Sequence, residues 1–441
     1  MKEKGILLPI FSLPSKYGIG DFGYEAYEFI DILEKNKITY WEILPINACN
    51  KLPYSPISYY ALNEDYISID KLKEIGLITR IDKMDKSEML YIDYKSKYYK
   101  RAFKKFNNKD REYKAFIKTK EIRQYAEYMS KIEDESKEYY LFLQYMLYKQ
   151  WIELRKYANQ RGIKIIGDMP AYPAFKSAET KYNSKCFEMK NDMFTFEAGA
   201  PPDYYNKDGQ KWNCPVYNVS HMKKYYYSYL TRRFEYYLKL FDKIRVDYFR
   251  GYDSFYKIPK GEEATKGYYS DGVSYDFFDI LFSNTNVKKE DLMVEDLGDI
   301  REETVKLRNY YQFTRQKILQ YSIDLKKLFD KDNEDENVLM FPGNHDCHTI
   351  YGWYKNLDYE NKERLKEFLA NNGCNNININ IGIMQYCLKC KAKICIIQAQ
   401  DILGLDDSSR INTPGTESEK NWSWRLQDFK EFEERIKFFN L

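Results

Sequence analysis

The 441-residue chain carries 70 Lys and Arg residues against 67 Asp and Glu, a near balance that argues against nucleic acid or an anionic membrane as its main partner. No apolar run approaches the length of a membrane span, and the first twenty residues contain prolines and lack the cleavage site of a secretory signal. Eight cysteines in so long a chain indicate free thiols and not a disulfide framework. We therefore expect a cytoplasmic protein with a neutral or small substrate.

Short β-rich runs alternate with longer amphipathic stretches, the pattern expected for repeated βα units and a parallel sheet. In chain order the runs are GILLP near residue 5, YWEILP near 40, KIIGDMP near 164, KIRVDYF near 243, DLMVED near 291, KILQYS near 317, NVLMF near 337 and KICIIQ near 393. Eight is the strand number of a (β/α)8 TIM barrel, which usually has about 250 residues. The sequence thus predicts an α/β fold in which residues 1–441 form a single barrel domain with insertions.

Helical spacing of apolar residues marks YEAYEFIDILEKN after the first run and TVKLRNYYQF after the fifth. Residues 72–160 are dense in Lys, Glu and Tyr and include EYYLFLQYMLYKQWIELRKYANQRG, so we expect a helical insertion that ends near Gly162. Residues 173–218 contain AGAPPDYYNKDGQKWNCPVYN, whose turn-forming residues exclude a long regular element. A loop of this length in a compact domain is usually functional, and we expect an active-site loop here.

Cys387 and Cys390 form one CxxC, and Cys395 lies nearby, a spacing that invites a zinc interpretation. No second pair and no suitably spaced histidine completes four ligands. We therefore expect buried cysteines and no structural metal.

Three acids follow strand-like runs in the second half of the chain: Asp247 in KIRVDYFRG, Glu295 in DLMVEDLGD and Asp346 in LMFPGNHDCHT. All strand ends of a parallel barrel open onto one face, so these carboxylates can converge on one substrate bond. Convergent carboxylates indicate acid/base or sugar chemistry. The alternative for each acid alone is a helix N-cap in a strand-to-helix loop.

The motifs around these acids carry a resemblance. In order, they are SLPSKYGIGDFG, PYSPISYYALN, IIGDMPAY, GAPPDYYNKDGQKW, RVDYFRGYDSFYKIP, VEDLG, GNHD and NTPGTESEKNWSWRL. Together they resemble the 4-α-glucanotransferases of the amylomaltase family, relatives of the α-amylases. The resemblance implies a barrel that cleaves an α-1,4-glucosidic bond with retention and passes the glycosyl unit to another sugar. It also implies malto-oligosaccharides and α-1,4-glucans as donor and acceptor, with no organic cofactor and no catalytic metal.

By motif position the resemblance implies that Asp247 is the nucleophile, Glu295 the general acid/base and Asp346 the third carboxylate, which steadies the distorted sugar. Arg245 lies two residues before Asp247 on the same strand face, where we expect it to keep the nucleophile ionised. A poorly solvated Glu295 beside an ionised Asp247 should have a raised pKa, and Asp296 should turn to the opposite face.

The resemblance also implies a set of sugar-binding residues: His345 and Asp168 at the cleavage subsite, Tyr54 stacked beneath that sugar, and Asp203, Gln210 and Trp212 around the acceptor side. His345 could instead be a loop histidine with satisfied hydrogen bonds, Asp168 an aspartate that begins a turn, and Tyr54 a core tyrosine. Tyr248 departs from the family, because His commonly follows the nucleophile, and we expect altered packing there without loss of a catalytic carboxylate.

Two other functions remain open at this stage. One is an α-glucan hydrolase on the same fold, which would use the same carboxylates. The other is a barrel that only binds glucan. The sequence leaves the oligomeric state open.

Overall fold

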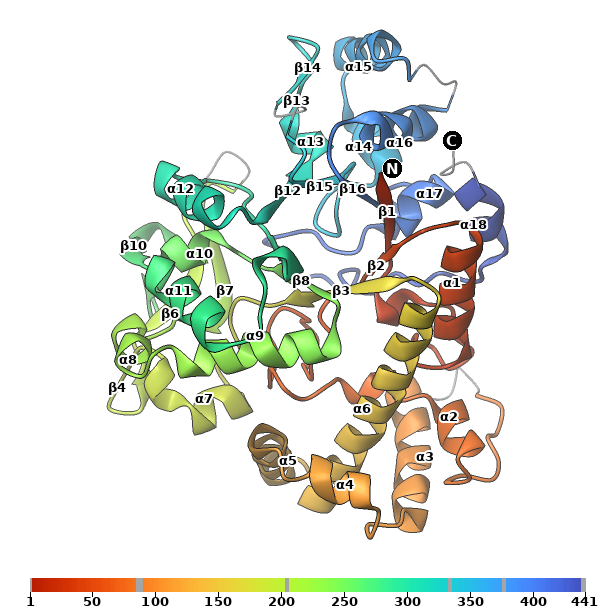
Figure 1. Cartoon of the computed structure of the whole chain (residues 1–441), viewed down its shortest axis with the longest axis vertical. Coiled ribbons are helices and arrows are strands. Elements are labelled where there is room, and N and C mark those ends of the chain that lie inside the picture. The colour runs from red at the N-terminus through yellow and green to blue at the C-terminus, as the bar shows by residue number, and fades with distance from the viewer. Residues whose placement is uncertain (1, 85–89, 203–205, 332–334, 375–377, 438–441) are drawn as a thin grey trace.

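Eight parallel strands close into a barrel at the centre of the molecule (Figure 1). The structure is a computed structural model, and it describes residues 2–84, 90–202, 206–331, 335–374 and 378–437. The barrel strands are β1 (Glu3–Leu7), β2 (Tyr40–Glu42), β3 (Lys164–Met169), β8 (Lys243–Val246), β11 (Leu292–Val294), β12 (Thr314–Ile318), β15 (Val338–Phe341) and β16 (Ile394–Gln398). Each pairs with the next in chain order, and β16 closes the barrel on β1. Every predicted run supplies one strand, so the predicted (β/α)8 barrel is confirmed.

The barrel strands are buried on both faces, and their side chains alternate between two apolar clusters. The cluster inside the barrel contains Leu7, Tyr40, Ile166, Met293, Ile318, Leu339, Phe341, Ile394 and Ile396. Residues between them, such as Trp41, point outward and pack against helices; the Trp41 ring lies 5.0 Å from that of Phe29 on α1 (Tyr24–Lys35). This alternation decides which polar residues near the strand ends face the barrel interior.

The helices predicted after the first and fifth strands are α1 and α12 (Glu302–Tyr311). The KILQYS run is less extended than expected, because β12 ends at Ile318 and α13 begins at the next residue. Further α-helices outside the two insertions include α9 (Ser228–Leu240), α10 (Arg250–Asp253), α11 (Ser274–Asn284), α13 (Leu319–Ser322), α14 (Ile350–Asn356), α15 (Tyr359–Asn371), α16 (Ile379–Lys389), α17 (Ala399–Leu403) and α18 (Lys430–Arg435). A short hairpin of β13 (Ile323–Asp324) and β14 (Phe329–Asp330) follows α13.

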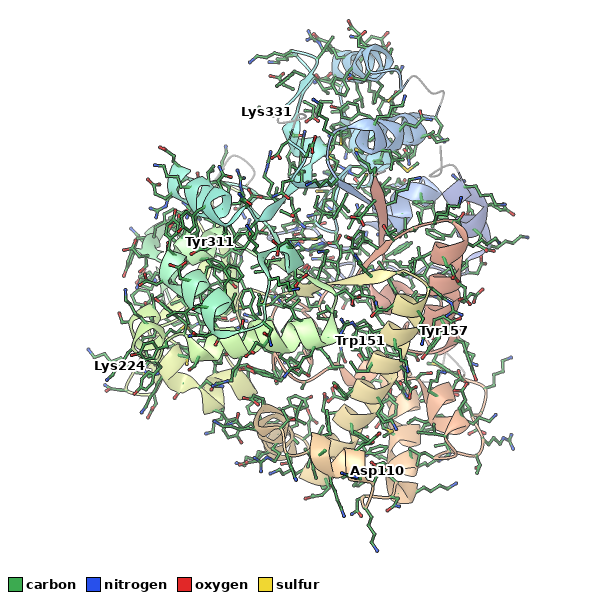
Figure 2. The ribbon with its side chains drawn as sticks, in the orientation of Figure 1. Asp110, Trp151, Tyr157, Lys224, Tyr311 and Lys331 are labelled. Atoms are coloured by element: carbon green, nitrogen blue, oxygen red, sulfur yellow. The ribbon has the colours of Figure 1, made fainter. Side chains whose placement is uncertain are left out.

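Between β2 and β3 the described residues form helices α2 (Ile69–Glu74), α3 (Tyr91–Lys105), α4 (Arg111–Phe116), α5 (Lys120–Ile132) and α6 (Lys137–Gln160), in the lower part of Figure 1. The Ser136 side chain caps α6 by accepting from the Tyr139 backbone N–H, and Gly162, at φ +75°, turns the chain just beyond its end. The Trp151 indole of α6 donates to the Leu240 carbonyl at 3.0 Å, which fastens α6 to the end of α9 (Figure 2).

Residues 173–218 hold more regular structure than their turn-rich sequence indicates. They contain α7 (Ala178–Tyr182), β4 (Met189–Lys190), β5 (Met193–Phe194), β6 (Phe196–Ala200) and β7 (Gln210–Pro215), with α8 (Val219–Lys224) directly after them. β6 and β7 join β9 (Ser254–Pro259) and β10 (Tyr268–Asp271) in an antiparallel sheet of order β10-β9-β6-β7. Because β6 pairs with a segment about sixty residues later, local sequence patterns do not reveal it.

Cys387 and Cys395 are buried as expected, whereas Cys390 is half-buried. Within the described ranges, no three His, Cys, Asp or Glu side chains are grouped so that they could hold a metal ion. In that same part of the chain, no helix combines the length and the apolar character that crossing a membrane requires.

Candidate active site

The three acids emerge where the barrel strands end. Asp247 directly follows β8, Glu295 directly follows β11, and Asp346 lies in the loop that β15 feeds. The backbone N–H groups of Asp247 and Glu295 continue the parallel ladder, donating to the carbonyls of Met169 (3.3 Å) and Val246 (3.0 Å). Because strands of a parallel barrel all end on one face, these carboxyls lie on the same face of the barrel.

None of the three acids is a helix N-cap. The helices that follow them begin after Phe249 (α10), Arg301 (α12) and Thr349 (α14). The capping alternative is therefore wrong for each acid, and the carboxyl groups are available to other partners.

Arg245 joins two aspartates of neighbouring strands. Its Nη1 donates to both carboxyl oxygens of Asp168, at 2.8 and 2.9 Å, and to Oδ1 of Asp247 at 3.0 Å. The Ala171 backbone N–H donates to the other oxygen of Asp247 at 3.3 Å. Each oxygen of Asp247 thus has one donor, which favours the ionised form.

Burial nevertheless raises the pKa of Asp247, because loss of hydration outweighs the attraction of Arg245. The guanidinium is shared with Asp168, whose own pKa burial raises to about 7. The expectation that Arg245 keeps Asp247 ionised therefore leaves out Asp168, which pairs with the same guanidinium. One cation serves two carboxyls.

Glu295 lies against the backbone of the residue that follows Asp247: its Oε2 accepts the Tyr248 N–H at 2.8 Å. Burial raises the pKa of Glu295 to about 8, with Arg245 opposing the shift and Asp247 adding to it. The raised pKa agrees with the sequence-based expectation. The next acid, Asp296, pairs instead with Arg308 on α12, outside the barrel interior.

Tyr54, Asp168 and His345 form a hydrogen-bonded chain. The Tyr54 hydroxyl donates to Asp168 at 2.5 Å and lies 2.8 Å from Nε2 of His345. Because a hydroxyl has only one hydrogen, Nε2 must be the donor in the second bond when Asp168 is ionised. Burial lowers the pKa of His345 to about 4, so the imidazole is neutral at pH 7. The Tyr54 and His345 rings lie nearly parallel, with centroids 5.4 Å apart.

Asp346 is held from the C-terminal part of the chain. The Asn412 side-chain amide donates to its Oδ1 at 2.7 Å, and Arg410 donates to its backbone carbonyl at 2.5 Å. The Asp346 side chain is 35% exposed, against 21% for Asp247 and 1% for the neighbouring His345, so its carboxyl is the most accessible of these groups.

The sheet in the second insertion places Gln210 and Trp212 beside this cluster. Both lie on β7, where the Trp212 indole donates to the Gln210 amide oxygen at 3.1 Å. The Trp212 ring meets the Tyr248 ring edge-on, with centroids 4.8 Å apart. Tyr248 has a left-handed φ of 50°, so this contact and not strand alternation sets the direction of its side chain. Asp203 lies outside the described residues.

Three residues near this cluster have no role assigned in the sequence-based prediction: Glu42, Asn412 and Trp422. Glu42 is the only charged residue of the apolar run YWEILP, and this lone charge is the sequence signal that could have identified it. Asn412 and Trp422 belong to the quoted motif NTPGTESEKNWSWRL, and the Trp422 ring centroid lies 5.7 Å from that of Tyr54. The sequence alone does not show that this distant motif returns to the barrel mouth.

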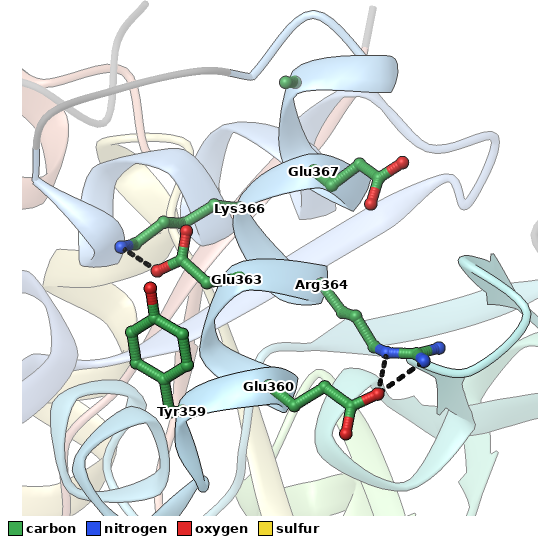
Figure 3. Close-up of a pocket in the computed structure, with 7 residues that line it drawn as sticks. Tyr359, Glu360, Glu363, Arg364, Lys366 and Glu367 are labelled. Carbon is green, nitrogen blue, oxygen red and sulfur yellow. Dashed lines mark hydrogen bonds and ion pairs between the residues drawn. The ribbon is translucent and has the colours of Figure 1, made fainter.

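A surface depression on α15 is lined by residues of that helix alone, including Tyr359 and Glu367 (Figure 3). Its charged side chains pair along the helix, Arg364 with Glu360 at 2.6 Å and Lys366 with Glu363 at 2.7 Å. It shares no residue with the carboxylate cluster. The cluster at the barrel mouth is therefore the candidate site.

Several carboxyls lie at the mouth of a parallel barrel. One of them is protonated near neutral pH and lies beside another that has hydrogen-bond donors on both oxygens. These features define an enzyme class: barrel enzymes that cleave glycosidic bonds with paired carboxyls. The profile of a family described as 4-alpha-glucanotransferase matches residues 8–138 and 130–430. The chain therefore belongs to the 4-alpha-glucanotransferase family, and it is an enzyme of that activity.

Individual relatives agree over the full length. A 4-alpha-glucanotransferase of Aquifex aeolicus is 34% identical over an alignment of 485 positions, gaps included, which covers 99% of this chain and 98% of that protein. One from Clostridium butyricum is 32% identical, over 95% of each chain. The structure of the amylomaltase from Streptococcus agalactiae in complex with acarbose matches with a TM-score of 0.93 at 26% identity, covering 100% of this chain and 98% of that one.

Proposed function

We propose that the chain transfers a segment of an α-1,4-glucan to the 4-hydroxyl of an acceptor glucose or glucan, with malto-oligosaccharides as donors and acceptors. The hydrogen bond from the Tyr248 N–H to Glu295 is the main observation behind this proposal. It holds Glu295, the protonated acid, next to Asp247, the residue before Tyr248. Retaining enzymes need two carboxyls about 5 Å apart, one ionised and one protonated. The raised pKa of Glu295 and the hydrogen-bond donors on both oxygens of Asp247 support this assignment of roles.

In the first step, the Asp247 carboxylate attacks the anomeric carbon and forms a covalent bond to it. The bond from that carbon to the glycosidic oxygen breaks, and the oxygen leaves with the proton of Glu295. In the second step, the Glu295 carboxylate takes the proton of the acceptor 4-hydroxyl. The resulting oxygen attacks the anomeric carbon and releases Asp247. Each residue returns to its starting charge.

The remaining residues bind sugar in this proposal. Asp346, fixed by Asn412 and partly exposed, accepts from hydroxyls of the distorted sugar at the cleavage position. Asp168, His345 and Tyr54 contact the same sugar. Trp212, Gln210 and Asp203 bind the acceptor. Trp212 of β7 packs against Tyr248, and in this proposal it limits the access of water to the glycosyl-enzyme, which favours transfer over hydrolysis.

Incubation with maltotriose tests the proposal. Transfer gives glucose and a ladder of longer chains while the total of reducing ends stays constant. A hydrolase raises the number of reducing ends, and a barrel that only binds glucan changes nothing. Asp247→Asn should abolish the ladder with its circular dichroism spectrum intact, whereas Asp276→Asn on the exposed face of α11 should leave transfer unchanged. Full activity of Asp247→Asn would overturn the nucleophile assignment.

A further inference from the structure

We propose that Glu42 is a positioning residue for this reaction: while its carboxyl is protonated, Arg245 stays with Asp168 and Asp247, and ionisation of Glu42 draws Arg245 away from them. The inference rests on the role proposed above for Asp247. It assigns a function to a buried acid that makes no contact with the sugar in that proposal.

Alternation along β2 places Glu42 inside the barrel. Tyr40 belongs to the interior cluster and Trp41 packs outward on α1, so Glu42 faces inward again. It pairs in register with the interior residue Leu7 of β1. Only 1% of Glu42 is exposed. A carboxyl group thus stands in the barrel interior at the level where the strands approach the reacting acids.

The surroundings of this carboxyl contain too few partners for a charge. Its Oε2 has no hydrogen-bond partner among the described residues. The charged groups that act on it are Arg245 of β8 and Asp168 of β3. Tyr40, two residues earlier on the same strand, donates instead to Glu3 at 3.2 Å. The facing residue of β1 is apolar.

Gln316 of β12 contributes neutral groups only. Its amide oxygen accepts from Nε of Arg245 at 3.4 Å, and its Nε2 has no partner within the described chain. Arg245 is therefore the one cation that acts on Glu42 from these neighbouring strands.

Counting charges shows why the protonation of Glu42 matters. Arg245 already bonds two carboxyls, so ionised Asp168 and Asp247 leave the cluster with a net negative charge. A third carboxylate would compete for the same guanidinium at a site with little hydration. Burial raises the pKa of Glu42 to about 8, in keeping with a neutral group at pH 7. The acid is thus poised to change charge just above neutral pH.

Glu42→Gln tests the inference, since glutamine keeps the shape of the neutral acid and cannot ionise. We expect kcat/KM for maltotriose within about twofold of the original enzyme near pH 6.5, with an unchanged acid limb of the pH profile. The alkaline limb should move to higher pH and lose one of its ionisations, because the side chain at position 42 then no longer titrates there. Glu64→Gln is the matched control: burial raises the pKa of Glu64 to about 7, but its partners are Tyr125 and Gln144 outside the barrel.

Thermal unfolding gives a second readout that needs no activity. When the pKa of a carboxyl is higher in the folded than in the unfolded state, the protein loses stability as pH rises from the unfolded to the folded pKa. Glu42→Gln should therefore flatten the fall of Tm between about pH 5 and 8. An alkaline limb equal to that of the original enzyme, or an unchanged slope of Tm against pH, would overturn the inference. A wrong nucleophile assignment is recognised separately, since Asp247→Asn would then retain transfer at every pH.

Discussion

At the residue scale, different neighbours give the carboxyls of Asp247 and Glu295 different tendencies to hold a proton. Asp247 and Glu295 each follow a barrel strand directly, yet only Asp247 bonds to Arg245. Glu295 accepts one backbone N–H and is held near the negative charge of Asp247. Both groups lose hydration, so the difference in direct donors decides which one stays protonated. This difference matches the distinct states that nucleophile and acid need.

Glu295→Gln should show both the catalytic and the energetic consequence. Transfer should fall by at least about 100-fold, the usual contribution of a general acid. The pKa of Glu295 is about 8 in the folded protein against an ordinary value of 4.5, so folding retains a proton that the unfolded chain loses. Stability conferred by the original side chain therefore falls as pH rises from about 4.5 to 8.

Glutamine does not titrate, so the Tm of Glu295→Gln should exceed that of the original enzyme by more at pH 8 than at pH 5. Differential scanning calorimetry at both pH values measures this, with Glu419→Gln on the exposed C-terminal segment as the control. Parallel Tm profiles for Glu295→Gln and the original enzyme would show that Glu295 is not protonated in the folded state.

At the element scale, strand pairing in the second insertion determines where Gln210 and Trp212 lie. β7 pairs with β6, which pairs in turn with β9, the strand that follows the segment with Asp247. Gly199 permits the close approach of β6 and β7, because a Cβ there would lie 2.1 Å from the Gln210 carbonyl oxygen. Trp212 is therefore positioned by the same chain segment that carries Asp247.

Trp212→Ala should weaken acceptor use more than donor cleavage. The change removes the flat apolar face proposed for the acceptor sugar and an edge-on contact with Tyr248 worth about 1 kcal/mol. We expect a raised KM for glucose as acceptor, a larger fraction of maltotriose hydrolysed and a Tm lower by only a few degrees. Trp212→Phe, which keeps an aromatic face, should restore most of the transfer. An unchanged acceptor KM in Trp212→Ala would exclude Trp212 from the acceptor site.

At the scale of the whole molecule, the sequence predicts the barrel better than the contacts at its mouth. The strands are predictable because each is a short apolar run that polar or turn-forming residues end. Asp247 and Glu295 are predictable as neighbours because parallel strand ends meet. The pairing of β6 with β9 and the contact of Asn412 with Asp346 depend on segments far apart in sequence, for which one chain offers no local signal.

The path of the chain after the last strand completes the site. The segment beyond α17 returns to the loop that follows β1. There the Ser12 hydroxyl donates to the Trp424 carbonyl at 2.8 Å, and the Leu426 N–H donates to the Ser12 carbonyl at 2.9 Å. On this path it delivers Asn412 to Asp346. Ser12, near the start of the chain, thus helps to hold the C-terminal segment whose Asn412 orients the Asp346 carboxyl.

Asn412→Ala should therefore impair catalysis with little effect on the fold. The Asn412 amide bonds to the Asp346 carboxyl, and losing a hydrogen bond to a charged group costs about 1.5–3 kcal/mol, which corresponds to a decrease of roughly 10- to 100-fold in kcat/KM. Asn412→Asp should be worse still, because it sets a second carboxylate against Asp346. The exposed Gln427→Ala in the same segment is the control for stability and should leave transfer unchanged. Equal kcat/KM values for Asn412→Ala and Gln427→Ala on maltotriose would show that Asp346 needs no orientation from the C-terminal segment.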